Sequence, residues 1–441
     1  MFVATKLPEN TKVSGWVQML PKRTPNPSLS KSINVDVAII GAGFAGLSAA
    51  RRLSQCNPKL RVAVLEAGEI AAGAAGRNSG FIIDLPHEVS SDEYAGSDAG
   101  PTRRHIMINR TAIKLASDVA QERGWGKDVF DPCGKYNIAM SAQGDEHISS
   151  YAKQLDALKE PYRLLDSRQV ADVTGTTAFT SAIFTPGTVI VQPAAYVRGL
   201  ADSLKGGVNI YEKTPALSLE AVGKEWRIKT PEGAVTAGKV IMANNGHAES
   251  FGIYRGLLMH VFTYASMTEE FSPSRLGGDR SWAATPAFPM GTTVRRVRGE
   301  RGDRILIRSR YTYNPRLKIS ENDVERAGRV HDRKFDARFP TLKGVQMEHR
   351  WGGAMALTWN GVPAYGEIEP GLFAACACNG VGATKATALG IAAADSILGI
   401  KSELLAAFGQ FEAPKSLPPQ PFLTIGAKAN LGFREWRAGK E

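Results

Sequence analysis

The most regular pattern of apolar positions lies near the start of the chain, where residues 35–40 form an almost unbroken apolar run. Such a run is typical of a strand buried on both faces of a parallel sheet. It ends in the glycine turn Gly41-Ala42-Gly43-Phe44-Ala45-Gly46, after which apolar residues recur at helical spacing from Leu47 to Leu53. A second apolar run, residues 62–65, leads directly to Glu66. The pattern predicts a strand, a helix and a second parallel strand in succession.

The glycines of this turn have the spacing of a dinucleotide-binding loop. Gly41 permits the tight turn, Gly43 lets the backbone approach a pyrophosphate, and Gly46 lets helix and strand pack closely. Free N–H groups at the start of the helix can bind the pyrophosphate, and Glu66 can accept hydrogen bonds from an adenosine ribose. We therefore predict that the chain binds NAD or FAD.

Helical and strand-like patterns continue along the rest of the chain. Helical spacing marks residues 102–123, 148–158 and 193–204, and strand-like runs lie at 135–140, 208–211, 216–221 and 226–230. An apolar run from Lys239 enters the turn Ala243-Asn244-Asn245-Gly246, residues 257–313 are rich in strand patterns, and residues 371–398 predict a strand, a glycine turn and a helix. Segments of nucleotide-binding type therefore occur early, in the middle and near the end, which predicts two interleaved domains.

The composition is that of an ordinary globular protein. The chain has 441 residues, of which 43% are hydrophobic and 22% charged. No apolar run reaches the roughly 18 residues of a membrane-spanning helix, and the first ten residues do not have the pattern of a signal peptide. We therefore expect a cytoplasmic protein without a membrane span.

Four cysteines in so long a chain do not indicate a disulfide framework. Cys376 and Cys378 lie in an apolar run with no second Cys or His pair nearby, so we predict small buried side chains there and no metal site.

The net charge of +11 is compatible with an anionic partner such as a nucleic acid, a membrane surface or an acidic substrate. The charge is spread along the chain, with one dense patch of seven arginines between Arg295 and Arg310. This patch has the pattern of two strands joined by a polar turn. We interpret it in the first place as the solvated outer face of an antiparallel sheet.

The order of these blocks resembles the D-amino-acid-oxidase-type FAD-dependent oxidoreductases. The matching segments are Gly41–Gly46, Leu65-Glu66-Ala67-Gly68, Gly76-Arg77-Asn78-Ser79-Gly80, Gln192-Pro193, Ala243–Gly246, Trp351-Gly352-Gly353, Gly361-Val362-Pro363, Gly366, Gly371-Leu372 and Asn379-Gly380-Val381-Gly382. Within that group the chain most resembles the branch of gamma-glutamylputrescine oxidase and the sarcosine- and glycine-oxidase-like enzymes, and an arm with Trp16 ahead of the first strand fits that branch. The resemblance spans essentially the whole chain.

The resemblance implies FAD rather than NAD as the cofactor. It places Gly41 to Gly46 at the pyrophosphate, Glu66 and Ala67 at the adenosine ribose, and Arg77, Asn78, Ser79 and Gly80 along the pyrophosphate and the flavin edge. It places residues 216–219, with Leu217, beside the adenine, and Ala243, Asn244 and Gly246 over that end. Relatives with a covalent flavin often carry a His where this chain has Arg77, and no cysteine attachment site is matched, so we expect non-covalent FAD.

The resemblance also gives a role to the late glycine turn, formed by Asn379, Gly380, Val381, Gly382, Ala383 and Thr384. The helix that follows would point its positive N-terminus at the flavin N1–C2 carbonyl edge. An approach that close requires glycine at 380 and 382.

The fold class predicted from these features is α/β, with a Rossmann-like FAD-binding domain interleaved with an antiparallel-sheet α+β substrate domain. We assign an arm to residues 1–34, the FAD-binding domain to 35–90, 185–250 and 351–412, the substrate domain to 91–184 and 251–350, and a tail to 413–441.

Residues on the substrate side are harder to predict. Period-two alternation along residues 305–313 puts Arg308 and Arg310 on one face and Tyr311 and Tyr313 on the other. If the arginine face meets the cavity, Arg308 can bind a carboxylate or phosphonate; if not, the tyrosines line the site. His260 is a further candidate, on a strand of the same sheet, although a structural role is commoner for such a residue. Trp351 and Trp359 are candidates for the pocket wall or for the core.

We expect an enzyme that oxidises the C–N bond of a small primary or secondary amine or amino acid, with an anionic substrate and with oxygen or another electron acceptor. The first alternative is a flavoenzyme that oxidises the C–O bond of a hydroxy acid or polyol phosphate. The second is a flavoprotein associated with RNA modification, suggested by the net charge. No RNA-binding module is visible in the sequence, so we expect no nucleic-acid partner. The sequence does not predict the exact substrate or the oligomeric state.

Overall fold

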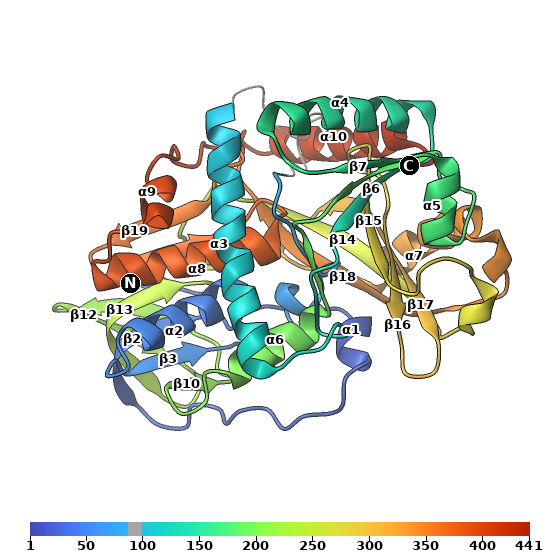
Figure 1. Ribbon diagram of the computed structural model, residues 1–441. Coiled ribbons are helices and arrows are strands. Elements are labelled where there is room, and N and C mark those ends of the chain that lie inside the picture. The colour runs from blue at the N-terminus through green and yellow to red at the C-terminus, as the bar shows by residue number, and fades with distance from the viewer. Residues whose placement is uncertain (87–98) are drawn as a thin grey trace.

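The computed structural model describes residues 1–86 and 99–441. Within these residues the strands form three sheets, of nine, eight and three strands. Figure 1 shows the two large sheets side by side, the first at the lower left with helices packed along it and the second at the right.

The nine-stranded sheet is parallel at its centre. Its central strands, in spatial order, are β10 (Val208–Tyr211), β3 (Val62–Leu65), β2 (Ile33–Ile40), β13 (Ala234–Met242) and β20 (Leu372–Cys376). The antiparallel strands β1 (Phe2–Val3), β11 (Ser218–Val222), β12 (Glu225–Lys229) and β19 (Ala364–Glu369) extend it. Val37 to Ile40 pair in register with both β3 and β13. Because both faces of these strands are covered, an uninterrupted apolar run is the pattern that they require.

Two helices begin directly after central strands of this sheet and pack against each other. They are α2 (Phe44–Cys56), after β2, and α8 (Gly382–Leu398), after β20. A Cβ added at Gly390 would lie 2.0 Å from the Ala45 carbonyl oxygen, so glycine is what allows α8 to approach α2 this closely. Further helices of this part are α3 (Ala99–Arg123), α6 (Pro193–Asp202) and α9 (Glu403–Phe408).

The eight-stranded sheet is mostly antiparallel. Its strands, in spatial order, are β18 (Met347–Leu357), β14 (Met259–Thr268), β17 (Asp303–Tyr313), β16 (Thr293–Arg298), β15 (Trp282–Pro286), β6 (Lys135–Ala139), β8 (Ser181–Thr185) and β7 (Arg163–Leu165). Its helices are α4 (Ala142–Leu158), α5 (Ser167–Thr174), α7 (Glu321–Arg338) and α10 (Phe422–Ala438). The short helix α1 (Gly15–Gln18) lies in the N-terminal arm, and the small sheet consists of β4 (Phe81–Ile82), β9 (Val189–Val191) and β5 (Phe130–Asp131).

The predicted α/β fold class, with a parallel and an antiparallel sheet built from interleaved segments, is confirmed. Two long helices were not predicted. One is α7; the other is α10, which occupies most of the segment expected to be a tail and packs against β17. Among the described residues, no helix has the length and apolar character needed to cross a membrane.

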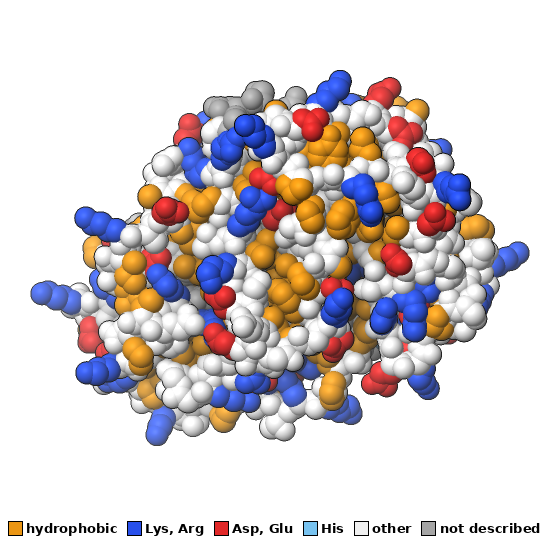
Figure 2. Space-filling view, in the orientation of Figure 1, with side chains coloured by type: hydrophobic (Ala, Val, Ile, Leu, Met, Phe, Trp, Pro, Cys, Tyr) orange, Lys and Arg blue, Asp and Glu red, His pale blue; other side chains and the backbone are white. Residues whose placement is uncertain are grey.

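The arginine-rich patch forms the two predicted strands, β16 and β17, but it is not a solvated face. Arg295 and Arg296 are 6% and 1% exposed, and Arg296 forms an ion pair with the buried Asp303 at 2.7 Å. The solvated interpretation is wrong for these side chains because Arg295 donates to the Ser79 and Val191 carbonyl oxygens, and Arg296 donates to the Gly277 carbonyl oxygen besides its ion pair with Asp303. Elsewhere, on the face drawn in Figure 2, lysine and arginine side chains are scattered among aspartate and glutamate.

Candidate functional site

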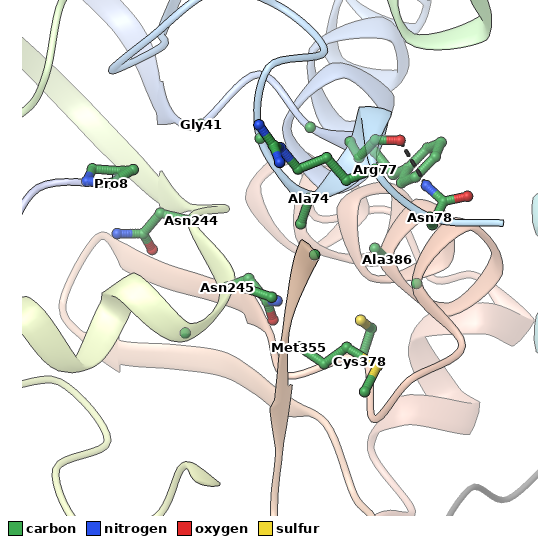
Figure 3. A pocket seen from close by; sticks show the side chains of 18 of the residues that line it. Pro8, Gly41, Ala74, Arg77, Asn78, Asn244, Asn245, Met355, Cys378 and Ala386 are labelled. Carbon is green, nitrogen blue, oxygen red and sulfur yellow. Dashed lines mark hydrogen bonds between the residues drawn. The ribbon is translucent and has the colours of Figure 1, made fainter. Parts of the chain in front are cut away.

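A cavity lies between the two large sheets, at the carboxyl ends of β2, β3, β13 and β20. One wall is built by the loops after these strands, and the other by residues of β14, β16, β17 and β18. Figure 3 shows Asn244 and Asn245 on one side of this space and Asn78 and Ala386 on the other. The carboxyl edge of a parallel sheet is where ligands of such folds bind.

The first glycine turn forms one end of the cavity. Gly41 has φ +108°, and a Cβ there would lie 2.7 Å from the Ala243 carbonyl oxygen. A Cβ at Gly43 would meet only Ala75 Cβ, at 3.6 Å, so its backbone is open to a ligand. Gly46 does not line the cavity; its added Cβ would lie 1.9 Å from the Gly41 carbonyl oxygen, which fits the predicted packing role. Ala42, Phe44 and Ala45 complete this wall with the N-terminus of α2.

Glu66 and Ala67 follow β3 at the same end. The Glu66 carboxylate accepts hydrogen bonds from the backbone N–H groups of Ala42 and Gly68, each at 2.9 Å. Burial raises the pKa of Glu66, and these two donors act against that rise because they favour the ionised form. A carboxylate has about four acceptor positions, so Glu66 can still accept bonds from two ribose hydroxyls.

The second glycine loop supplies Arg77, Asn78 and Ser79 to the lining, but not Gly80. The Arg77 guanidinium donates to the carbonyl oxygens of Ala72 at 2.7 Å, Gly352 at 3.0 Å and Lys12. Burial lowers its pKa to about 10. A further bond runs to the Thr11 carbonyl oxygen at 3.3 Å, so all three guanidinium nitrogens donate to backbone carbonyl oxygens. The side chain therefore ties the loop to the N-terminal arm and β18 and has little hydrogen-bonding capacity left for a pyrophosphate.

The residues predicted beside the adenine are only partly at the cavity. Ala243, Asn244 and Gly246 line it, as does Ala216, whereas Leu217 does not. Leu217 instead lies directly before β11, and its backbone N–H donates to the carbonyl oxygen of Lys229 in β12 at 2.8 Å. Residues 6–10 of the arm line the cavity here, which the sequence did not predict because the arm carries no motif.

The late glycine turn brings Gly380, Gly382 and Ala383 to the cavity, together with the N-terminus of α8. Gly380 has φ +83°, a conformation that favours glycine. Asn379 does not line the cavity, because its side chain accepts from the Thr358 N–H and donates to the Val362 carbonyl oxygen, both at 2.8 Å. Thr384 is also behind the wall, where its hydroxyl accepts from the Ile83 N–H at 3.0 Å.

The substrate-side strand β17 does not alternate regularly. Thr263 pairs with Tyr311 and Tyr264 with Ser309, so Arg310 is an extra residue in a β-bulge, with φ +63°. The predicted separation of Arg308 from Tyr311 onto opposite faces is therefore wrong. Arg308 lines the cavity and donates to the Tyr311 hydroxyl, while Arg310 turns away to an ion pair with Glu435 of α10.

His260 is not among the residues that line the cavity. It is 3% exposed, lies behind Gly246, and pairs with Glu249 through Nε2. The arrangement makes it a support for the wall rather than a group in contact with a ligand. Trp351 is fully buried and donates to the Arg77 carbonyl oxygen at 3.0 Å, whereas Trp359 is 60% exposed, so neither walls the pocket.

Several lining residues have no sequence signal of their own. These are Phe262 to Ala265 of β14, Ala354 and Met355 of β18, Thr285, Thr293, Cys376 and Cys378. Cys376 and Cys378 are buried as predicted, and both also line the cavity, which was not predicted. Most of these residues reach the cavity because strands that are distant in the sequence pair with one another, and no local motif predicts such pairing.

The lining residues fit FAD. Two helix N-termini converge on the cavity, as an anionic pyrophosphate and an electron-rich flavin edge require. An added Cβ at Gly43 would meet only Ala75 Cβ, at 3.6 Å, so the backbone there is accessible to a ligand, and Glu66 retains free acceptor positions.

Comparison with known proteins gives consistent findings. The sequence profile of a family described as FAD dependent oxidoreductase (DAO) matches residues 36–396. The chain is 26% identical over 415 residues to gamma-glutamylputrescine oxidoreductase of Escherichia coli strain K12, a match that covers 91% of both chains. It is 24% identical over 389 residues to glycine oxidase of Bacillus licheniformis, covering 85% of this chain and 96% of the relative. Among solved structures, glycine oxidase from Geobacillus kaustophilus superposes with a TM-score of 0.70 at 20% identity, over 88% of this chain and all of that one.

Proposed function

The chain belongs to the DAO family of FAD-dependent oxidoreductases, and from this premise we propose that it oxidises the C–N bond of a small amine or amino acid that carries a carboxylate. The product would be an imine, which water hydrolyses. Bound FAD supplies the hydride acceptor for such a reaction. The names of the relatives, gamma-glutamylputrescine oxidoreductase and glycine oxidase, are compatible with an amine substrate.

The observation that carries the proposal is the state of Arg308. Its guanidinium faces the cavity, where it donates to the Ser79 hydroxyl at 3.4 Å and to the Tyr311 hydroxyl. Among the described residues, no carboxylate lies within ion-pair distance of it, whereas Arg296, Arg304 and Arg310 each have one. A partly buried guanidinium without a counter-ion is suited to a substrate carboxylate, which it can bind through two parallel hydrogen bonds.

The rest of the substrate wall is suited to position and desolvate an amine. The residues that the eight-stranded sheet contributes to the cavity are Phe262 to Ala265, Thr285, Thr293, Arg308 and Gly353 to Met355, and none of them is a carboxylate or an imidazole. We therefore propose that the substrate enters with its amine already deprotonated and that no side chain of this wall acts as a general base. Under this proposal kcat/KM rises with pH until the free substrate amine is neutral.

The proposal is tested by mixing the purified holoenzyme anaerobically with a panel of amines and hydroxy acids and following the flavin absorbance. N-Alkylglycines and amino acids should bleach the flavin and release ammonia or an alkylamine on hydrolysis. Bleaching by a 2-hydroxy acid or a polyol phosphate, with none by any amine, would contradict the proposal and favour oxidation of a C–O bond. Repeating the assay with oxygen and with an artificial dye identifies the class of electron acceptor.

We further propose that the FAD is held non-covalently. The thiols that line the cavity, Cys376 and Cys378, are unsuited to attack a flavin, because burial raises the pKa of Cys376 to about 12 and also raises that of Cys378. Precipitation with acid should leave the yellow colour in the supernatant. Colour in the pellet, with a peptide heavier by the mass of FAD, is the contrary result.

A further inference from the structure

The cavity wall on the eight-stranded sheet contains a row of polar side chains from four neighbouring strands. The members of this polar row are Asn137 of β6, Thr285 of β15, Thr293 of β16 and Arg308 of β17. Thr285 pairs with Asn137 and Thr293 with Arg308, and the pairing of Ala284 with Val294 sets Thr285 beside Thr293. Paired residues on adjacent strands project to the same face of a sheet, so the row forms one continuous polar stripe. Thr285, Thr293 and Arg308 line the cavity directly.

A buried lysine stands behind the end of the row that is far from Arg308. Lys135 precedes Asn137 by two residues and so projects to the same face of β6. Its ammonium donates to the Thr285 hydroxyl at 3.3 Å and to the Asn137 side-chain oxygen, and the residue is 2% exposed. Burial lowers its pKa to about 8, while the charge of Asp84 acts in the opposite direction. Within the described residues, no carboxylate lies within ion-pair distance of Lys135.

The sheet itself does not require these polar groups. On its opposite face the same strands carry Ala284, Val294 and Ile307, which belong to an apolar cluster. Polar groups buried without full hydrogen bonding destabilise a fold, and the Asn137 amide nitrogen has no hydrogen-bond partner among the described residues. The Thr285 hydroxyl accepts from Lys135 at 3.3 Å and donates to the Tyr136 carbonyl oxygen at the long distance of 3.5 Å. A ligand that accepts hydrogen bonds would take this donor and the Thr293 hydroxyl and would offset the charge of Lys135.

We propose that the polar row binds a second anionic group of the substrate, so that the enzyme acts on amines that carry two carboxylates. This inference rests on the proposed function for its reaction, but the binding site that it describes does not. Arg308 holds one carboxylate, while Thr285 and Thr293, with Lys135 behind them, hold the other. The strands β17 and β15 are two strand spacings apart, about 10 Å at the backbone, so a linear dicarboxylate can span the two positions.

The site is tested first by binding, without turnover. The FAD-loaded enzyme is titrated with unreactive dicarboxylates from malonate to adipate and with monocarboxylates of matched length, and the dissociation constants are taken from the flavin absorbance. The best dicarboxylate should bind at least tenfold more tightly than its monocarboxylate. Equal affinities at every chain length would overturn the proposal.

Substitutions at Thr285, Thr293 and Lys135 test whether a preference for dicarboxylates over monocarboxylates comes from the polar row. The double variant Thr285→Val, Thr293→Val keeps side-chain volume and should reduce dicarboxylate affinity at least tenfold while monocarboxylate affinity stays nearly constant. Lys135→Met should do the same, and Lys135→Arg should restore part of the preference. The matched control is Thr230→Val, since Thr230 is buried, lies outside the cavity beside the nine-stranded sheet, and has a hydroxyl that donates to the Gly233 carbonyl oxygen at 2.9 Å. If the threonine double variant and Lys135→Met both still bind the dicarboxylate more tightly than the monocarboxylate, the proposal is also overturned.

Turnover separates this inference from the proposed function. Amines with two carboxylates, such as aspartate, glutamate and N-carboxyalkyl amino acids, should show kcat/KM at least tenfold above amines with one. If dicarboxylates bind at the polar row but no amine is oxidised, the proposed function fails and the anion site stands. If amines are oxidised without any preference for a second carboxylate, the proposed function stands and this inference fails.

Discussion

Arg308 owes its position to a residue that does not touch the cavity. Because Arg310 is the extra residue of a β-bulge, the alternation of β17 is reset between Ser309 and Tyr311. Tyr311 thereby reaches the Arg308 guanidinium, which also lies over its ring at 5.4 Å from the centroid. The bulge at Arg310 thus places Tyr311 on the same face of β17 as Arg308, where the tyrosine holds the guanidinium at the cavity.

Replacing Arg308 tests its role as the carboxylate anchor. Arg308→Met should raise KM for a carboxylated amine about tenfold to a hundredfold, since a hydrogen-bonded charged group contributes about 1.5–3 kcal/mol, while kcat changes less. Tyr311→Phe removes one of the groups that hold the guanidinium and should raise KM by a smaller factor. Steady-state kinetics at saturating acceptor measures both. An unchanged KM in Arg308→Met would exclude Arg308 as the anchor.

At the scale of elements, α10 holds the bulge from outside the sheet. Glu435 forms an ion pair with Arg310 and accepts a hydrogen bond from the Tyr311 backbone N–H at 2.7 Å. Glu435→Ala leaves both groups unpaired and loosens the segment that fixes Arg308, so we expect KM to increase several-fold with kcat nearly unchanged. Glu412→Ala is the control, since Glu412 is an exposed acid of the same terminal segment whose only ion pair given by the structure is with exposed Lys415. Equal KM values in the two variants would show that α10 does not position Arg308.

The close contact between α2 and α8 should affect both the stability of the fold and the binding of FAD. Gly390→Ala places a methyl group 2.0 Å from the Ala45 carbonyl oxygen, which must separate the two helices whose N-termini line the cavity. Overpacking of this kind costs about 1–3 kcal/mol. We therefore expect a lower Tm and a lower FAD content after dialysis.

The control for Gly390→Ala is another helical glycine in open surroundings. A Cβ at Gly426 of α10 would meet no atom within 4 Å, so Gly426→Ala should leave FAD content unchanged and stabilise the protein by about 0.5–1 kcal/mol. If both variants retain FAD equally, close approach of α2 and α8 is not what shapes the cofactor site.

Elements with a strong local pattern could be predicted from the sequence, whereas contacts between distant segments could not. The run before Gly41 and the turn before Gly382 gave β2, α2 and α8 because burial and backbone geometry restrict the residues allowed there. The bulge at Arg310 is bonded by Glu435, far along the chain, and residues 6–10 of the arm reach the cavity only in the folded protein. Helix α10 was missed because prolines precede it and apolar residues such as Ile425 and Trp436 lie on its exposed side, which masks the helical period.

At the scale of the whole molecule, we expect stability in acid to depend on histidines that are buried in the folded protein. Burial lowers the pKa of His331 in α7 to about 3, and it lowers those of His105 and His247 to about 4. His331 is fully buried, with its ring nitrogens near the Ser266 hydroxyl at 2.8 Å and the Ser309 carbonyl oxygen at 3.4 Å. The folded protein thus holds this ring in its neutral form.

The sign of the pH dependence follows from proton linkage. The pKa of His331 is near 3 in the folded chain and about 6.5 in the unfolded chain, so below pH 6.5 the unfolded state binds a proton that the folded state does not. His331 then lowers the free energy of unfolding by up to about 1.4 kcal/mol per pH unit as the pH falls from 6.5 toward 3, and His105 and His247 do so toward pH 4. His331→Gln retains a hydrogen-bonding side chain at this position but cannot titrate. Its Tm, measured with saturating FAD, should therefore fall less steeply between pH 6.5 and 4 than that of the wild type. Ser266→Ala keeps the titrating ring and should retain the steep dependence. Parallel curves for the wild type and His331→Gln would show that His331 is protonated in the folded protein and that its enclosure between α7 and the eight-stranded sheet does not limit acid stability.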